Sequence, residues 1–273
     1  MTRCKSILRL LSGAKIQWSP PNGCAVCGRR MPLLQLNVIS KELAEQWEIN
    51  SEWDKYFTER EGLVCTGCGS ARRSVFLAEG ILGFARQSLG LESRTFAELV
   101  AEADFQKLNV AELNSLGALH RFLVRSPGVV YSEYGSTNPN IRSEDLFNLS
   151  YENESFDLIF HSETLEHVPD FRRAWMEIHR VLKPRGVCIF TIPVVADGRK
   201  TRTRAHVDNG TLVHDLPASY HGVPGEKKTD YLVFHEFGED CVEGIQSLGF
   251  RINIVRDKNN PSLICFFASK SPV

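Results

Sequence analysis

From residue 108 onward, short apolar runs alternate with segments whose apolar residues recur every three to four positions. The runs predict strands and the recurring positions predict helices, because these are the side-chain periods of the two structures. This alternation indicates an α/β fold, with a mostly parallel Rossmann-like sheet and an antiparallel C-terminal hairpin. Predicted strands cover residues 108–113, 128–134, 156–161, 187–193, 250–255 and 263–268, and predicted helices cover 117–124, 170–182 and 240–248.

The front of the chain has a different pattern. Apolar residues at helical spacing predict helices at residues 70–89 and 96–107, and a shorter one at 41–47. A turn-rich break at residues 19–23 precedes this part. We therefore predict two units, a small N-terminal lobe over residues 1–107 and a Rossmann-like domain over residues 108–273.

Two cysteine pairs stand in the N-terminal lobe, Cys24 with Cys27 and Cys65 with Cys68, and a glycine follows each pair. Two thiols on one tight turn, with a second such turn elsewhere, are typical of a four-cysteine Zn²⁺ site. Redox pairs usually open a helix after a strand, and neither pair has that context. The pairs predict a structural zinc site, with free thiols or a redox pair as the alternatives.

The composition describes an ordinary globular protein of 273 residues, with 42% hydrophobic and 24% charged residues and a net charge of -1. A chain so close to neutral does not bind duplex nucleic acid by bulk charge. No apolar run approaches the roughly 20 residues that span a membrane. Eight cysteines in a chain of this length do not make a secreted disulfide scaffold, so we expect a reducing cytoplasm.

Polar residues follow the predicted strands. Ligands of parallel sheets bind at the carboxyl ends of the strands, which makes these residues the candidate site. An acid about 20 residues beyond the first strand commonly binds a ribose, and Glu133 stands 21 positions after Glu112. The residues at the strand ends are Glu112, Asn114, Gly117, Glu133, Tyr134, Asp145 and His161.

Residues 155–170 read SFDLIFHSETLEHVPD, and residues 180–186 read RVLKPRG. These segments resemble the fourth strand, the turn and the following helix end of class I S-adenosylmethionine-dependent methyltransferases, of the type 11 kind. The resemblance covers about residues 108–268. It implies a Rossmann-like fold, S-adenosylmethionine as cofactor and methyl transfer as the activity. Glu166 and His167 of this turn are candidates for a direct catalytic part.

In the resembling family the first-strand loop is rich in glycine, whereas here only Gly117 is a glycine and Asn114 stands at a usual glycine position. Asn adopts positive φ more readily than most residues, while the bulky Leu116 resists close approach of a cofactor. The resemblance implies that Glu112, Asn114 and Gly117 form this loop, that Glu133 binds the ribose and that Asp145 and Leu146 flank the adenine. Tyr134 and His161 complete the predicted cofactor site.

Residues 194–237 form an insert where substrate loops are expected, and a base that takes a proton from the methyl acceptor should lie there. Histidine is suited to proton transfer near neutral pH. We predict His206 and His221 as the catalytic pair, with a second metal site in the insert as an alternative. The insert also holds Asp208, His214, Asp215, Tyr220 and His235.

The leading hypothesis is methyl transfer to a small-molecule or saccharide-type acceptor, most readily at oxygen. One alternative is a methyltransferase-like scaffold that has lost cofactor binding, with Leu116 filling the pocket. The other is an RNA base methyltransferase whose zinc lobe grips phosphates through Arg29, Arg30, Arg72 and Arg73.

Overall fold

The computed structural model describes residues 16–18, 21–221 and 231–271. Residues 1–15 and 19–20 of the predicted N-terminal lobe, and 222–230 of the predicted insert, lie outside the described residues. Within the described part, no helix has the length and apolar character that crossing a membrane requires.

A seven-stranded sheet forms the centre of the molecule, in the order β13-β14-β8-β7-β4-β5-β6. The five strands from β8 to β6 run parallel, and β14 is antiparallel to both β8 and β13. The predicted fold class and C-terminal hairpin are confirmed. The strands are β4 (Val110–Leu113), β5 (Val129–Glu133), β6 (Arg142–Ser143), β7 (Phe156–Ser162), β8 (Leu182–Thr191), β13 (Phe250–Arg256) and β14 (Ile264–Lys270).

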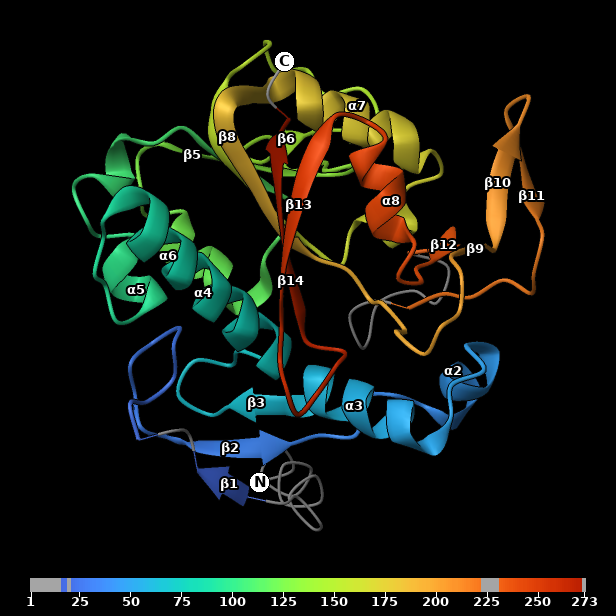
Figure 1. The fold of residues 1–273 in the computed structure, drawn as a ribbon, viewed down its shortest axis with the longest axis horizontal. Coiled ribbons are helices and arrows are strands. Elements are labelled where there is room, and N and C mark those ends of the chain that lie inside the picture. Colours follow the sequence, from blue (N-terminus) through green and yellow to red (C-terminus); the bar gives the residue numbers. More distant parts are fainter. Residues whose placement is uncertain (1–15, 19–20, 222–230, 272–273) are drawn as a thin grey trace.

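Helices cover both faces of this sheet, as Figure 1 shows. Successive strand residues point to opposite faces, so Leu158 packs in one hydrophobic cluster and Ile159 in the other. The helices over one face are α4 (Arg72–Phe84), its π-helical continuation Ala85–Leu89, α5 (Phe96–Leu99) and α6 (His120–Leu123), and those over the other are α7 (Phe171–Val181) and α8 (Cys241–Gln246).

The first part of the chain builds a small antiparallel sheet next to the large one, drawn in blue in Figure 1. Asn50 caps its longer helix by accepting backbone hydrogen bonds from Glu52 and Trp53, each at 3.0 Å. The elements are β1 (Ile16–Trp18), β2 (Pro32–Gln35), α2 (Lys41–Gln46), α3 (Ser51–Gly62) and β3 (Leu63–Cys65). Whether residue 107 divides two domains stays a prediction.

Two small two-stranded sheets occupy the insert between β8 and α8. One is a hairpin that projects at the side of the molecule in Figure 1, formed by β10 (Ala205–Asp208) and β11 (Thr211–His214). The other pairs β9 (Arg202–Thr203) with β12 (His235–Glu236). Short 3-10 helices lie at Phe105–Lys107, Gly117–Leu119 and Leu165–His167.

Candidate functional site

A cleft of about 1160 Å³ opens at the carboxyl ends of β4, β5 and β7. This is the edge at which parallel sheets bind ligands. The volume exceeds the roughly 300–1,000 Å³ of common ligand pockets, so the cleft has room for a cofactor and a second molecule. Residues from the small N-terminal sheet region form its opposite wall, among them Leu43, Trp47 and Phe57.

The loop after β4 adopts the conformation that the sequence suggested. Asn114 has a φ of 58°, in the left-handed region, so the positive φ expected for it is confirmed. Its side-chain oxygen accepts a hydrogen bond from the Tyr134 backbone N–H at 3.0 Å, and its own N–H donates to Ser132 at 2.9 Å. Asn114 therefore ties the loop after β4 to the end of β5.

Replacing Asn114 tests this conformation. Asn114→Ala is expected to lower the free energy of unfolding by about 1–2 kcal/mol, because Ala tolerates positive φ poorly. Asn114→Gly loses the same side-chain hydrogen bond but keeps the φ, and should be the milder change. Urea unfolding measures both variants, and equal losses would contradict a role for the backbone conformation.

Glu112 supports the loop from inside the fold. Its side chain is fully buried, accepts the Leu116 N–H at 2.8 Å and lies 2.8 Å from Nδ1 of His120. Burial raises the pKa of this carboxyl. Neither Glu112 nor Gly117 lines the cleft, so the structure gives both a place behind the predicted cofactor site. Leu116 packs in the hydrophobic cluster under the loop, outside the cleft.

Five of the predicted cofactor residues do meet in the cleft: Asn114, Glu133, Tyr134, Asp145 and Leu146. Glu133 ends β5 and forms a hydrogen bond with the hydroxyl of Tyr131. Asp145 lies beyond β6 and accepts the Phe147 N–H at 3.3 Å, as in an Asx turn.

The predicted histidines have three different environments. His161 is fully buried next to Phe190 and Trp175 and lies outside the cleft, because its side chain points to the face of the sheet that α7 and α8 cover. Burial lowers its pKa to about 3. His206 stands on β10, 2.7 Å from Asp215, beside a separate cavity of about 450 Å³. His221 lines the cleft, and the structure does not bring His206 to it.

Arg60, in the N-terminal wall of the cleft, is a site residue that the sequence analysis did not predict. Arg60 on α3 has a side chain only 1% exposed, and it forms two hydrogen bonds with Glu163, at 2.7 and 2.8 Å. It also donates to the carbonyls of Ser262 and Ile192, at 3.1 and 3.3 Å. Charge would ordinarily keep Arg60 on the surface, and only its spacing from the apolar Trp53 and Phe57 indicates an inward face.

Glu163 is the carboxylate that pairs with Arg60. It follows β7 with a φ of 50°, a left-handed conformation that the surrounding contacts maintain. Burial would raise the pKa of Glu163, but Arg60 and Arg73 outweigh burial and lower it to about 2. Arg73 also pairs with Glu61 at 3.0 Å, so two guanidinium groups face two carboxylates here.

Glu166 is a further acid, which lies behind this part of the cleft without lining it. It is fully buried in the 3-10 helix after β7, and neither carboxylate oxygen has a hydrogen-bond partner among the described residues. Burial and the nearby Glu163 raise its pKa well above its ordinary value. His167 and His221 stand at the cleft surface next to it, with ring centroids 4.8 Å apart.

Comparison with known proteins agrees with this geometry. Residues 65–190 match the model of a family described as "Methyltransferase domain". The matched segment runs from the second cysteine pair into β8, so it contains β4, the Asn114 loop, Glu133 and the turn with Glu163 and Glu166. This segment is similar to a methyltransferase domain.

The chain is also similar to the demethylmenaquinone methyltransferases of two Staphylococcus epidermidis strains, each 30% identical over 159 residues. The aligned part is 57% of this chain and 53% of each relative, so the chain spans about half the length of the curated relatives it matches. Solved structures are similar at lower identity. A Clostridium acetobutylicum S-adenosylmethionine-dependent methyltransferase is 14% identical with a TM-score of 0.42, covering 71% of this chain and 98% of that one.

A Burkholderia thailandensis 1,6-didemethyltoxoflavin-N1-methyltransferase, solved with S-adenosylhomocysteine, is 13% identical with a TM-score of 0.41. It covers 95% of this chain and 100% of that one.

The four predicted zinc cysteines meet where the segment that matches the family model begins. Their sulfurs all lie within 4.8 Å of one another, and Cys24 and Cys68 are 3.7 Å apart. Four thiolates on one zinc ion, with bonds of about 2.3 Å, stand roughly 3.8 Å apart. Both turns close through the glycine after the second cysteine, where Gly28 and Gly69 have φ of 72° and 73°. The geometry fits a tetrahedral metal ion.

Proposed function

We propose that the protein transfers a methyl group from S-adenosylmethionine to an oxygen of a small-molecule or saccharide-type acceptor. The observation that supports this most is the meeting of five predicted cofactor residues in one cleft at the carboxyl ends of the parallel strands. Glu133 would accept hydrogen bonds from the ribose hydroxyls, and Asp145 and Leu146 would flank the adenine. The loop around Asn114 would lie against the methionine part.

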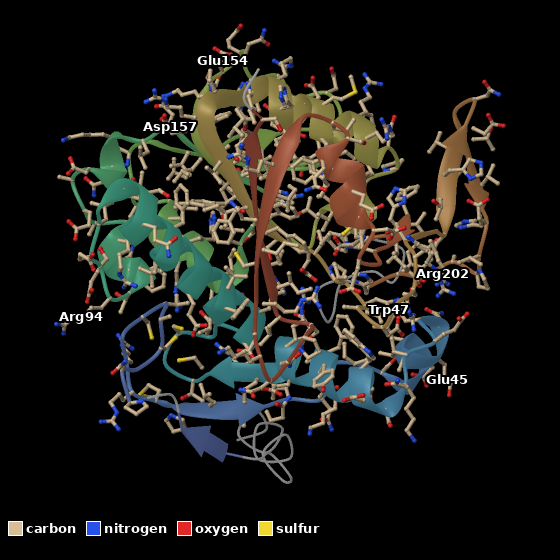
Figure 2. The ribbon with its side chains drawn as sticks, viewed as in Figure 1. Glu45, Trp47, Arg94, Glu154, Asp157 and Arg202 are labelled. Atoms are coloured by element: carbon tan, nitrogen blue, oxygen red, sulfur yellow. The ribbon has the colours of Figure 1, made fainter. Side chains whose placement is uncertain are left out.

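The acceptor would occupy the other end of the cleft, between the turn after β7 and the N-terminal wall. Trp47 and Phe57 supply aromatic surface there, and Arg73 supplies a cation. Figure 2 shows Trp47 near Arg202 at the junction of α2 with the insert, where Arg199 donates to the Trp47 carbonyl at 2.8 Å. An aromatic floor with a few fixed polar groups is typical of small-molecule sites.

The reaction is an in-line displacement that needs alignment above all. The acceptor oxygen would form the new carbon–oxygen bond while the carbon–sulfur bond breaks, S-adenosylhomocysteine would leave, and the acceptor proton would pass to a base. Of the two histidines predicted for that part, His221 is the one in the cleft. Burial lowers the pKa of His221 to about 3, so its imidazole is neutral at pH 7.

The two alternative functions have weaker support. A scaffold that has lost its cofactor would fit a pocket filled by Leu116, but this side chain packs in the core beneath the loop. An RNA grip needs its arginines on one free surface, whereas Arg72 pairs with Glu79 and Asp257 and Arg73 pairs with Glu61.

The four cysteines support a second part of the proposal, a structural zinc ion. Cys24, Cys27, Cys65 and Cys68 would hold the ion, and it would cross-link the two turns.

Cofactor binding by Glu133 can be measured by isothermal titration with S-adenosylmethionine. Glu133→Ala should weaken binding by about 10- to 100-fold, since hydrogen bonds to a charged group contribute about 1.5–3 kcal/mol. Glu243→Ala removes an exposed acid on α8 that lies outside the cleft, and it should leave cofactor binding unchanged. Absence of heat with the unmodified protein, together with no competition by S-adenosylhomocysteine, would refute the proposed activity.

A further inference from the structure

We infer that Glu166, His167 and His221 bind a divalent transition-metal ion at the acceptor end of the cleft. One ligand atom from each of these residues lies within 4.8 Å of the other two. Metal binding here does not depend on methyl transfer, and it is distinct from the four-cysteine site in the N-terminal lobe.

The carboxylate of Glu166 is a buried group without a partner. Both of its oxygens lack a hydrogen bond among the described residues, and the side chain is 0% exposed. A buried carboxylate is stable only when it is paired, protonated or bound to a metal. The nearest guanidinium groups are already engaged, Arg60 with Glu163 and Arg73 with Glu61. Glu166 is thus the acid that remains for a cation.

His167 is oriented as a metal ligand. Its Nδ1 lies 3.0 Å from the carbonyl oxygen of Leu232, and a carbonyl can only accept, so Nδ1 carries the proton. This leaves the lone pair on Nε2, which lies 3.7 Å from Oε1 of Glu166. Metal-binding histidines almost always donate their other N–H to a carbonyl or carboxylate in this way.

His221, from the insert, is the third residue of the set. Its Nε2 is buried and has no hydrogen-bond partner among the described residues. The ring packs against His167 on one side and Trp47 on the other, with centroids 4.8 and 5.2 Å away. The packing fixes a second imidazole nitrogen beside the carboxylate.

The spacing of these atoms favours an ion over direct hydrogen bonds. The 3.7 Å between His167 and Glu166 is too long for a hydrogen bond. Ligands of a tetrahedral zinc ion, with bonds of 2.0–2.2 Å, stand roughly 3.3 Å apart, so a small closure of the three side chains brings them into range. Two imidazoles and one carboxylate suit zinc or ferrous iron far better than the oxygen-seeking Mg²⁺ or Ca²⁺.

Three protein ligands leave a coordination position open, and His167 and His221 face the cleft. A metal ion there would bind an oxygen of the molecule that occupies the acceptor end. This use of the ion rests on the proposed function. A metal ion at this position would favour an acceptor with a hydroxyl or enol oxygen. His221 would then act as a ligand of the ion and not as the base.

Zinc content tests the site without cofactor or acceptor. The full chain, reconstituted with ZnCl₂ and desalted, should hold two zinc ions per chain by mass spectrometry of the metal. His167→Ala, His221→Ala and Glu166→Gln should each hold one, and the exposed His214→Ala on the β11 strand should keep two. Glu166→Gln preserves the side-chain shape, so it serves if an alanine variant does not fold by circular dichroism.

The inference is overturned if the unmodified chain retains one zinc ion, or if Glu166→Gln, folded, retains two. Cobalt substitution distinguishes the sites further. Thiolate-to-cobalt charge-transfer bands report the cysteines, and they should persist in Glu166→Gln while half of the bound cobalt is lost. The zinc and cobalt measurements do not use S-adenosylmethionine. A negative result in them would therefore not contradict the proposed methyl transfer, and a negative cofactor titration would not contradict the proposed metal site.

Discussion

Loss of zinc from the four-cysteine site is expected to unfold the lobe that contains β1, β2 and β3. Binding of structural zinc contributes on the order of 10 kcal/mol in small modules, and three of the four cysteines are buried in the hydrophobic cluster that also contains α4. Cys65→Ser should have the same effect as a strong chelator. Trp47 and Trp53 are two of the four tryptophans and are buried in this lobe, so tryptophan fluorescence reports its unfolding.

Loss of zinc should also disturb the residues that line the cleft. The first cysteine turn is bonded to the start of α5, where Phe96 and Ala97 donate to the carbonyls of Ala25 and Val26 at 2.8 and 3.1 Å. The same lobe carries Trp47 and Phe57, which line the cleft. A zinc-free protein should therefore lose acceptor binding before it loses the central sheet, whose parallel strands have their own core.

Cys188→Ala is the matched control for Cys65→Ser. Cys188 is an equally buried thiol on β8, outside the cluster, so its removal should lower stability by only about 1 kcal/mol and leave the zinc content unchanged. A chelated protein whose fluorescence matches that of the untreated protein would contradict a structural ion. A zinc content well under one equivalent in the purified chain would also contradict a structural ion.

The parts of the fold that the sequence predicts well are those with a strong local period. Residues 170–182 and 240–248 were predicted as helices, and α7 and α8 occupy them. The strands at 108–113, 128–134 and 156–161 correspond to β4, β5 and β7. In each of these helices and strands, the positions that are buried in the fold are the apolar positions in the sequence. The sequence pattern therefore predicts the element directly.

Elsewhere long-range contacts decide the structure. The predicted helix at 96–107 is wrong in length, because α5 ends at Leu99 and only Phe105–Lys107 turns again, while Phe96 and Phe105 are buried at its two ends. The predicted strand at 187–193 begins too late, since β8 starts at Leu182, directly after α7, and runs through residues 184–186. Helix α3 was missed, because most of its surface is polar.

The site shows the same division. The residues that follow strands, such as Asn114, Glu133 and Asp145, could be predicted because the topology of a parallel sheet brings strand ends together. The role of Arg60 could not be predicted, because its partner Glu163 lies 103 positions away and no local pattern links the two residues. His206 and His221 are close in the sequence, but the β10–β11 hairpin carries His206 to another cavity.

Arg60→Ala is expected to lower the free energy of unfolding by about 3 kcal/mol, because it leaves Glu163, a carboxylate only 17% exposed, without its main partner. Arg60 also joins α3 to the carbonyls of Ser262 and Ile192, so the N-terminal wall should loosen from the sheet. Arg86→Ala is the control, since Arg86 pairs with Glu92 at the surface and should contribute under about 1 kcal/mol. Urea unfolding measures both.

The pH dependence of stability gives a second measurement of the same contact. Arg60 and Arg73 outweigh burial and lower the pKa of Glu163 from 4.5 to about 2, so the pair stabilises the fold above pH 4.5, and this contribution disappears as the pH falls toward 2. Arg60→Ala should weaken that acid dependence, whereas Arg86→Ala should keep it. The double variant Arg60→Met with Glu163→Met should be more stable than Arg60→Ala, because it removes both buried charges. If Arg60→Ala and Arg86→Ala unfold at the same urea concentration, Arg60 does not hold the cleft together.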